Sequence, residues 1–419
     1  MSDFPSLCQN FEVKFTYSLH FTEGVFNPEN PILAQTAAGS GSNLPKKLLL
    51  LIDDGLLAHH PKVISQARNY CHRHRQKLML ARNPLILPGG EGVKNDPEHV
   101  AVIHRAVNDT GLCRHSYLVA LGGGALIDTA GYAAATAHRG LRLIRLPTTV
   151  MAQADASIGV KNSINAFGKK NFLGTFAPPW AVINDADFLP TLSPRDWRSG
   201  LAEAVKVALI KDADFFNYLE KCVPALVNRD LRQMQRVIYR CADLHLNHIT
   251  GGGDPFESGS SRPLDFGHWA AHKLENLSAH QLRHGEAVAI GIALDVTYAY
   301  LAGMLPLPDW QRILALLTGL GLPISSPWLS SESQILPGLQ EFREHLGGPL
   351  TIIMLRGISR PVEIQAVDEK LMATALALLQ GQDADGILRS GALYRNLQSS
   401  LSQVRVYQDS PQIGNSPLN

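Results

Sequence analysis

The first 190 residues alternate short apolar runs with segments of helical periodicity. Continuously apolar runs bounded by Gly, Pro or Asp predict buried strands at 46–53, 116–124, 141–149 and 180–185. Residues 125–140 form a helical pattern of small residues, with Gly140 as the expected glycine after the last turn. Because strands alternate with helices, we predict an α/β fold with a parallel, doubly wound sheet.

The pattern becomes helical from about residue 191. The pair Ser193–Pro194 predicts a capped helix start. Helical patterns then continue to about residue 379, apart from one strand-like run at 350–356. We therefore predict an N-terminal α/β domain over 1–190 and a mainly α-helical domain over 191–397.

Composition narrows the possible functions. The chain has 419 residues, of which 45% are hydrophobic, and this suits two or three globular domains. A formal net charge of +1 gives no reason to expect nucleic acid or a membrane surface as a partner. No apolar run approaches the roughly 20 residues that span a bilayer.

The chain ends and the cysteines bear on the expected cellular compartment and on order at the termini. The N-terminus lacks a signal-peptide pattern, and the five cysteines lack CxxC spacing, so we expect a cytoplasmic enzyme with reduced thiols. Residues 34–47 have the composition of a flexible loop. Residues 398–419, rich in Ser, Gln, Asn and Pro, are expected to be a disordered tail.

Three glycines, 122–124, lie between a predicted strand and a predicted helix. Glycine lets the backbone approach a phosphate, and the helix N-terminus supplies free N–H donors. A tight strand–helix turn explains the same residues equally well, and the run is not a GxGxxG motif. The Asp128 carboxylate either accepts a hydrogen bond from a ribose hydroxyl or interacts favourably with the positive N-terminal end of the helix. Glu91 and Lys94 belong to a second glycine-rich stretch, 87–96, which alone reads as a surface loop.

Residues 146–176 form a long glycine-punctuated segment with few helix or strand signals, and such segments inside compact domains tend to be functional. The segment carries Asp155, Lys161, Lys169, Lys170 and Asn171. Lysine and asparagine beside glycine turns suit a phosphorylated ligand, although a basic surface loop is the alternative.

Polar residues also occur in the helical half. Glu203 and Lys206 are three apart on an otherwise apolar helix, so they form either a surface pair or, as their neighbours favour, a buried functional pair. His268 and His272 are four apart on one helix, and His284 begins the next.

Two of these histidines with Glu203 would make a His2Glu metal site with open positions. Surface, capping or core histidines are the alternatives. His280 lies in a polar turn and is expected to be exposed.

Together these motifs resemble, in order, those of the sugar phosphate cyclases, the superfamily of 3-dehydroquinate synthase. The resemblance runs from about residue 47 to 380. Its motifs are GGG-x3-D (Gly122 to Asp128), RG (Arg139), PTT (147–149), D-x5-K (Asp155, Lys161), KN (Lys170, Asn171), GLAE-x2-K (Glu203, Lys206), GH-x3-H (His268, His272) and HGEAVA (His284).

The resemblance implies an NAD-binding α/β domain, a helical metal domain and a homodimer that acts on a phosphorylated sugar. It implies Glu203, His268 and His284 as ligands of Zn2+ or Co2+. The NAD residues that it implies are Asp53, Glu91, Lys94, Gly123, Gly124, Asp128, Thr148, Thr149, Asp155, Lys161, Lys170 and Thr191. Lys161, Asn171 and His272 would hold the substrate phosphate, helped by Arg139 of the neighbouring subunit, and Lys206 and Asp155 would contact the reacting end.

The chemistry that the resemblance implies involves no net redox change. NAD oxidises a ring hydroxyl, the metal polarises that oxygen, and phosphate leaves by β-elimination. Hydride then returns, the ring opens, and an intramolecular aldol reaction closes a carbocycle.

Departures from the dehydroquinate synthase pattern fall on the expected substrate wall. His245 stands where that enzyme has a lysine for the substrate carboxylate, and Asp265 stands where it has asparagine. Arg262 is one residue closer to His268 in the sequence than the corresponding arginine is in dehydroquinate synthase. The departures favour sedoheptulose 7-phosphate, a heptulose 7-phosphate without a carboxylate, as substrate, and the chain looks most like the 2-epi-valiolone synthase branch. The alternatives are 3-dehydroquinate synthase, an iron-type alcohol or glycerol dehydrogenase, and a non-catalytic sugar-phosphate sensor.

Overall fold

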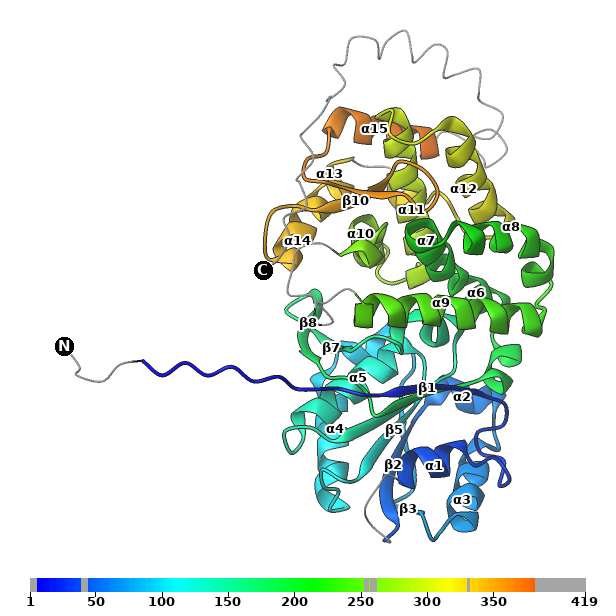
Figure 1. Cartoon of the computed structure of the whole chain (residues 1–419), viewed down its shortest axis with the longest axis vertical. Coiled ribbons are helices and arrows are strands. Elements are labelled where there is room, and N and C mark those ends of the chain that lie inside the picture. The colour runs from blue at the N-terminus through cyan, green and yellow to red at the C-terminus, as the bar shows by residue number, and fades with distance from the viewer. Residues whose placement is uncertain (1–5, 39–43, 252–255, 257–261, 330–331, 381–419) are drawn as a thin grey trace.

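The computed structural model describes residues 6–38, 44–251, 256, 262–329 and 332–380. A sheet with helices on both faces forms one half of the molecule, and a group of helices forms the other (Figure 1). The α/β fold with a parallel sheet and a helical second half is therefore confirmed. The domain boundaries at 190 and 397 stay predictions, and the predicted tail 398–419 lies outside the described residues.

The described residues of the first half form a seven-stranded parallel sheet. Its order is β1 (Ser18–Thr22), β9 (Ala181–Asp185), β6 (Arg142–Pro147), β5 (Tyr117–Gly122), β2 (Lys46–Asp53) and β3 (Leu78–Leu80), and β4 (Leu85–Leu87) also pairs with β2. The four predicted strands are confirmed. The other three were not predicted, because they are short and only partly buried.

Helices cover both faces of this sheet. Leu33 and Tyr70, from α1 (Ile32–Ala38) and α3 (Val63–Arg73), pack on one face. Ile103 and Ile127, from α4 (Pro97–Asp109) and α5 (Gly124–Thr136), pack on the other. The sheet is thus buried on both sides, as its continuously apolar strands require.

Two boundary predictions in this half are wrong. The helix predicted to reach residue 140 ends at Thr136, because Ala137 is extended and the next two residues, His138 and Arg139, have positive φ. Residues 34–38, predicted as part of a flexible loop, form most of α1, whose residues Leu33, Ala34 and Ala37 are buried.

The segment 146–176 is more regular than predicted. A π-helical turn at Ala152–Ala156 is followed by an antiparallel hairpin of β7 (Lys161–Ala166) and β8 (Lys169–Phe176). The hairpin was missed because β7, KNSINA, lacks the alternation of apolar and polar residues that marks a strand.

The second half is helical from Pro194 onward, as predicted. Its helices are α6 (Pro194–Ser199), α7 (Leu201–Lys211), α8 (Ala213–Val227), α9 (Leu231–Gly251), α10 (His268–Leu277), α11 (His284–Leu301), α12 (Leu307–Gly319), α13 (Glu332–Ile335), α14 (Pro337–Leu346) and α15 (Glu369–Gln380). Ser193 caps α6 by accepting a hydrogen bond from the Asp196 backbone N–H. The predicted late strand is β10 (Ile352–Leu355), paired with β11 (Pro361–Ile364).

Helix α11 lies at the centre of this half. Nearly all of its side chains are buried, and α7, α10, α12 and α15 contact it. A helix that is apolar on all sides belongs in a core. Two elements of the site described below, α7 and α10, are therefore attached to the most buried helix of the chain.

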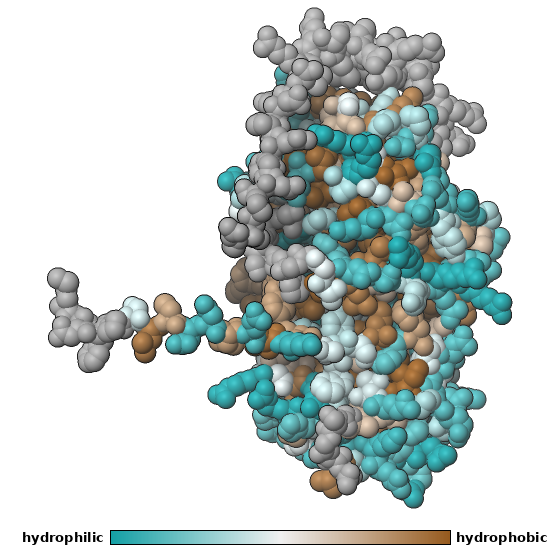
Figure 2. Space-filling view, viewed as in Figure 1, coloured by the Kyte–Doolittle hydropathy of each residue, from teal (hydrophilic) through white to brown (hydrophobic). Residues whose placement is uncertain are grey.

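Residues 6–14 extend away from the rest of the molecule (Figure 1) and expose the apolar side chains of Leu7, Phe11 and Val13. Figure 2 shows brown atoms on this extension. Within the part of the chain that the structure describes, no helix is both long and apolar enough to cross a membrane.

Candidate functional site

A cleft of about 1220 Å³ lies between the carboxyl ends of the strands and the helical half. Ligands of parallel α/β sheets bind at this edge, because loops and helix N-termini converge there. All but two of the predicted site residues line the cleft: Asp53, Glu91, Lys94, Gly123, Gly124, Asp128, Thr148, Thr149, Asp155, Lys161, Lys170, Asn171, Thr191, Lys206, His245, Arg262, Asp265, His268, His272 and His284. The two others are Glu203 and Arg139.

The strand ends supply the wall formed by the first half. Asp53 is the last residue of β2, caps α2 (Asp54–His59) and accepts a hydrogen bond from the Gly55 backbone N–H at 2.9 Å. Gly123 precedes α5 without a capping side chain, so N–H groups at the start of this helix remain available to an anion. The glycine turn is therefore compatible with a phosphate site, although its first N–H group, that of Gly123, is held by the Asp53 carboxylate.

Three potential metal ligands meet on the opposite wall. The ligand atoms of Glu203, His268 and His284 all lie within 4.8 Å of one another. Oε1 of Glu203 is 3.7 Å from Nε2 of His268 and 3.6 Å from Nε2 of His284, and it accepts no hydrogen bond from any described residue. Ligand atoms on one tetrahedral zinc ion lie about 3.3 Å apart, so these residues fit a zinc-sized ion with small adjustments.

Two glycines allow these histidines to approach each other. Gly267, which precedes His268, has φ of +77°, a left-handed conformation that favours glycine. A Cβ atom on Gly285, which follows His284, would overlap the backbone carbonyl of Ser199. The positions next to His268 and His284 therefore each require glycine, one for its backbone conformation and one for its lack of a side chain.

Burial keeps His268 and His272 neutral. Burial, with Lys206 and His284, holds the pKa of His268 well below its ordinary value. Burial, with Lys170, lowers the pKa of His272 to about 3. A neutral imidazole is the form that binds metal, and a neutral His272 contacts a phosphate only as a hydrogen-bond donor.

Lys206 lies between two carboxylates. Its ammonium nitrogen is 2.5 Å from Oε2 of Glu203 and 3.5 Å from Oδ2 of Asp155. Burial lowers the pKa of Lys206, but the two carboxylates outweigh burial and leave it above its ordinary value. Glu203 and Lys206 are thus the buried pair that their apolar neighbours favoured, and Lys206 stays a cation at neutral pH.

His245 is also held by Asp155. Its Nδ1 lies 2.8 Å from Oδ1 of Asp155. Burial raises the pKa of Asp155, but Lys206 and His245 outweigh this effect and leave it well below its ordinary value. One ring nitrogen of His245 is therefore engaged by a carboxylate of the protein.

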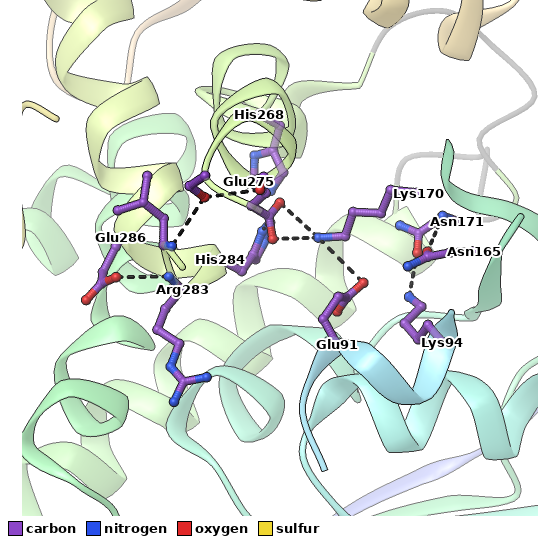
Figure 3. A network of polar contacts seen from close by, with 12 residues as sticks. Glu91, Lys94, Asn165, Lys170, Asn171, His268, Glu275, Arg283, His284 and Glu286 are labelled. Atoms are coloured by element: carbon purple, nitrogen blue, oxygen red, sulfur yellow. Dashed lines mark hydrogen bonds and ion pairs between the residues drawn. The ribbon is translucent and has the colours of Figure 1, made fainter. Parts of the chain in front are cut away.

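A second set of polar contacts links the β7–β8 hairpin to the rest of the sheet half and to helix α10 of the helical half. The Lys94 ammonium donates to Asp128 at 2.7 Å and also to Asn171, so residues predicted to bind NAD and phosphate contact each other. Lys170 donates to both oxygens of Glu275, at 2.7 and 2.9 Å, and lies 4.0 Å from Glu91 (Figure 3).

Two predicted placements need comment. Arg139 is exposed on the turn between α5 and β6 and does not line the cleft of its own chain. His280 was predicted to be exposed, but it is half-buried in the turn after α10 and lines the cleft. The prediction was wrong because the turn packs against the cleft wall.

Sequence reasoning missed Glu275, Arg145 and Asp295. Glu275 follows His268 and His272 at helical spacing i, i+4, i+7, and this polar stripe on an apolar helix was a usable signal. Arg145 lies inside an apolar strand and Asp295 inside an apolar helix, where a single charged residue was the only sign of a buried role.

The sequence of the chain is similar to those of known proteins. Residues 84–199 match the family described as 3-dehydroquinate synthase N-terminal, and residues 200–340 match 3-dehydroquinate synthase C-terminal. A 3-dehydroquinate synthase of Coxiella burnetii is 36% identical over 295 residues, which cover 70% of this chain and 81% of that protein.

Two solved structures are similar over most of the chain. A 2-epi-5-epi-valiolone synthase from Streptomyces hygroscopicus subsp. jinggangensis, with NAD+ and Zn2+ bound, is 29% identical with a TM-score of 0.81, covering 90% of this chain and 100% of its own. A 2-deoxy-scyllo-inosose synthase with carbaglucose-6-phosphate, NAD+ and Co2+ has a TM-score of 0.71 over 85% of this chain and 95% of its own, and at 23% identity it shows a shared fold.

Proposed function

The chain belongs to the 3-dehydroquinate synthase family, and from that premise we propose that it is an NAD- and metal-dependent sugar phosphate cyclase, a carbon–oxygen lyase. Its proposed substrate is sedoheptulose 7-phosphate, which it converts to 2-epi-valiolone or a related C7 cyclitol. The steps are transient oxidation, phosphate β-elimination, re-reduction, ring opening and intramolecular aldol closure.

One observation carries this proposal. The Glu203, His268 and His284 ligand set and the Lys206 cation face the Gly123 turn across a single cleft. The chemistry requires a nucleotide, a Lewis acid and a phosphate site around one small ring, because each acts on the same substrate within a few bond lengths. The glycine turn, the ligand set and the hairpin cations supply these three parts.

Each residue has a proposed role toward the substrate. When bound, NAD accepts and returns a hydride and the metal polarises the ring oxygen. Lys206, a buried cation, stabilises negative charge that develops on oxygen at the reacting end. Asp155 orients Lys206 and His245. Lys161 and Asn171 of the hairpin bind the phosphate, and neutral His272 donates a hydrogen bond to it.

The substrate wall supports a sugar without a carboxylate. His245, aligned with the carboxylate-binding lysine of dehydroquinate synthase, is held by Asp155 at 2.8 Å. Asp265 lines the same cleft, and its negative charge acts on both Lys206 and His272. A substrate carboxylate beside Asp265 would be repelled, whereas a sugar hydroxyl would be able to donate to it.

A second candidate is 3-dehydroquinate synthase itself, favoured by the 36% identity to the Coxiella burnetii protein of that name. Arg262 lines the cleft and is the cation that would face a carboxylate. Purified protein is to be incubated with NAD, Zn2+ and either sedoheptulose 7-phosphate or the shikimate-pathway heptulosonate phosphate. We expect phosphate release from sedoheptulose 7-phosphate, and turnover of the heptulosonate alone would refute the substrate assignment.

The same reaction distinguishes the other classes. A cyclase regenerates NAD, so absorbance at the NADH band stays flat while phosphate accumulates, whereas an alcohol dehydrogenase accumulates NADH. A non-catalytic sensor releases no phosphate from either sugar. We also propose a homodimer in which Arg139 reaches the partner's cleft, since Arg139 is exposed and outside its own.

A further inference from the structure

His284 faces a different carboxylate with each ring nitrogen. Its Nε2 lies 3.6 Å from Oε1 of Glu203, on the side of the candidate metal ligands. Its Nδ1 lies 3.1 Å from Oε2 of Glu275, and Figure 3 shows Glu275 beside His284 and joined to Lys170. Glu275 is 3% exposed and comes from α10, the helix that also supplies His268.

This arrangement fixes the tautomer of His284. A neutral imidazole carries one proton, and a nitrogen that binds metal must be the unprotonated one. A carboxylate has no proton to donate, so the Glu275 contact places the proton of His284 on Nδ1 and leaves Nε2 free to face Glu203. Both oxygens of Glu275 also accept from the Lys170 ammonium group, so the carboxylate faces His284 as an acceptor.

Lys170 places a cation on the same carboxylate. Its ammonium nitrogen is 2.7 and 2.9 Å from the two oxygens of Glu275, and its side chain is largely buried. His272, Glu275 and His284 also have ligand atoms within 4.8 Å of one another, so they form a second potential metal trio beside the first. The ammonium group of Lys170 already binds the carboxylate of that second trio.

We propose that Glu275 is a positioning residue for the metal site, and that Lys170 closes the second trio to metal. Glu275 holds His284 with Nε2 directed at the ion, and Lys170 neutralises Glu275 so that it does not act as a ligand. The inference rests on the metal site of the proposed function. It adds that the chain selects one ion position out of two that share His284.

Zinc affinity tests the first part. Zinc-loaded full-length protein is titrated with a chromophoric chelator to obtain the Kd for Zn2+. Glu275→Gln loses control of the tautomer, because an amide donates to Nδ1 as readily as it accepts from it, and we expect Zn2+ binding 10–100-fold weaker. The control is Glu341→Gln. It removes a carboxylate of α14 that pairs with Lys273 of α10, the helix of Glu275, and that contacts none of the candidate metal ligands. A Kd of Glu275→Gln within threefold of the control would overturn the proposal.

The double variant Lys170→Met/Glu275→Gln covers the case in which an unpaired Lys170 unfolds the single variant. It removes both buried charges, a change that folded proteins often tolerate. We expect the same 10–100-fold weakening, and an affinity like that of the wild type would again overturn the assignment. If the wild type itself binds no zinc, the metal site of the proposed function fails instead.

Zinc stoichiometry tests the second part. Lys170→Met keeps Glu275 but removes its cation. A second Zn2+ can then displace the Nδ1 proton of His284 to solvent, so that the ring bridges both ions. We expect two Zn2+ per chain, measured by elemental analysis after equilibrium dialysis, against one in the wild type. The second ion should be absent from the double variant, which lacks the carboxylate. One Zn2+ per chain in Lys170→Met would show that Lys170 does not close the second trio.

Discussion

The guanidinium of Arg145 supports the segment that carries two proposed substrate residues, Asp155 and Lys161. It is fully buried on β6 and donates to the carbonyl oxygens of Ser157 at 2.8 Å and Gly159 at 2.6 Å. It also donates to the Lys161 carbonyl at 3.3 Å and to Oδ1 of Asn162 at 2.7 Å. All four acceptors are neutral, so Arg145→Met removes hydrogen bonds without leaving one of these acceptors as an unpaired charge.

The structure gives the magnitude of this change. Two of the acceptor contacts, to Ser157 and Asn162, are buried, and losing each costs about 1–3 kcal/mol, while the two partly hydrated contacts cost about 1 kcal/mol each. Burial lowers the pKa of Arg145 to about 10, which corresponds to about 3 kcal/mol against the charged form that Met would recover. We therefore expect a net loss of about 1–5 kcal/mol in the free energy of unfolding.

Urea unfolding of wild type and Arg145→Met measures this loss, and phosphate release over a range of sugar phosphate concentrations measures its effect on the site. We expect KM to rise, because the segment that carries Lys161 loses its support. Arg142→Met is the control on the same strand, where the guanidinium lies 4.1 Å from the Trp180 ring centroid, a contact worth about 0.5–1 kcal/mol. A loss no larger than in this control, with KM unchanged, would refute the reasoning.

Four further predictions concern the site and its support. Lys206→Met should lower phosphate release by about 100-fold or more, while Lys211→Met at the end of the same helix should not; equal rates would contradict the role of Lys206. Removing metal with a chelator should stop turnover, and Zn2+ or Co2+ should restore it; activity that survives complete metal loss would exclude the proposed Lewis acid. Burial raises the pKa of Asp295 to about 7, so its protonated form favours the folded state and its contribution to stability is lost as pH rises from about 4 to 7, by up to about 4 kcal/mol. The stability difference between wild type and Asp295→Asn should change over that range, and a constant difference would show that Asp295 titrates normally. Mixing Arg139→Ala with Lys206→Met subunits should restore about a quarter of wild-type activity if Arg139 acts across a dimer, and no recovery would place its action elsewhere.

Local patterns predicted the parts of the site that lie within one element. Glu203 and Lys206 share a helix, and His268 and His272 share another, so their spacing alone indicated their relation. The glycine run at 122–124 was identified from its place between a strand and a helix.

Interactions between distant residues were not predictable in this way. The helical spacing of Glu275 was a usable signal, but its ion pair with Lys170 was not predictable, because Lys170 lies 105 positions earlier in the chain. Arg145 was missed because two of its four acceptors lie on a strand, KNSINA, that has no strand pattern, and the other two lie on the turn before it. Asp295 accepts from the Trp269 indole, 26 positions before it, and only packing of α11 on α10 brings the two together.

The Lys170–Glu275 contact joins β8 of the sheet half to α10 of the helical half. Any ligand that changes the spacing of these two elements also changes the surroundings of His284. Binding free energies are state functions, so a metal ion at His284 must alter the affinity for that ligand by the same factor by which the ligand alters the affinity for metal. An affinity of this protein for nucleotide or sugar phosphate therefore has meaning only at a stated metal occupancy.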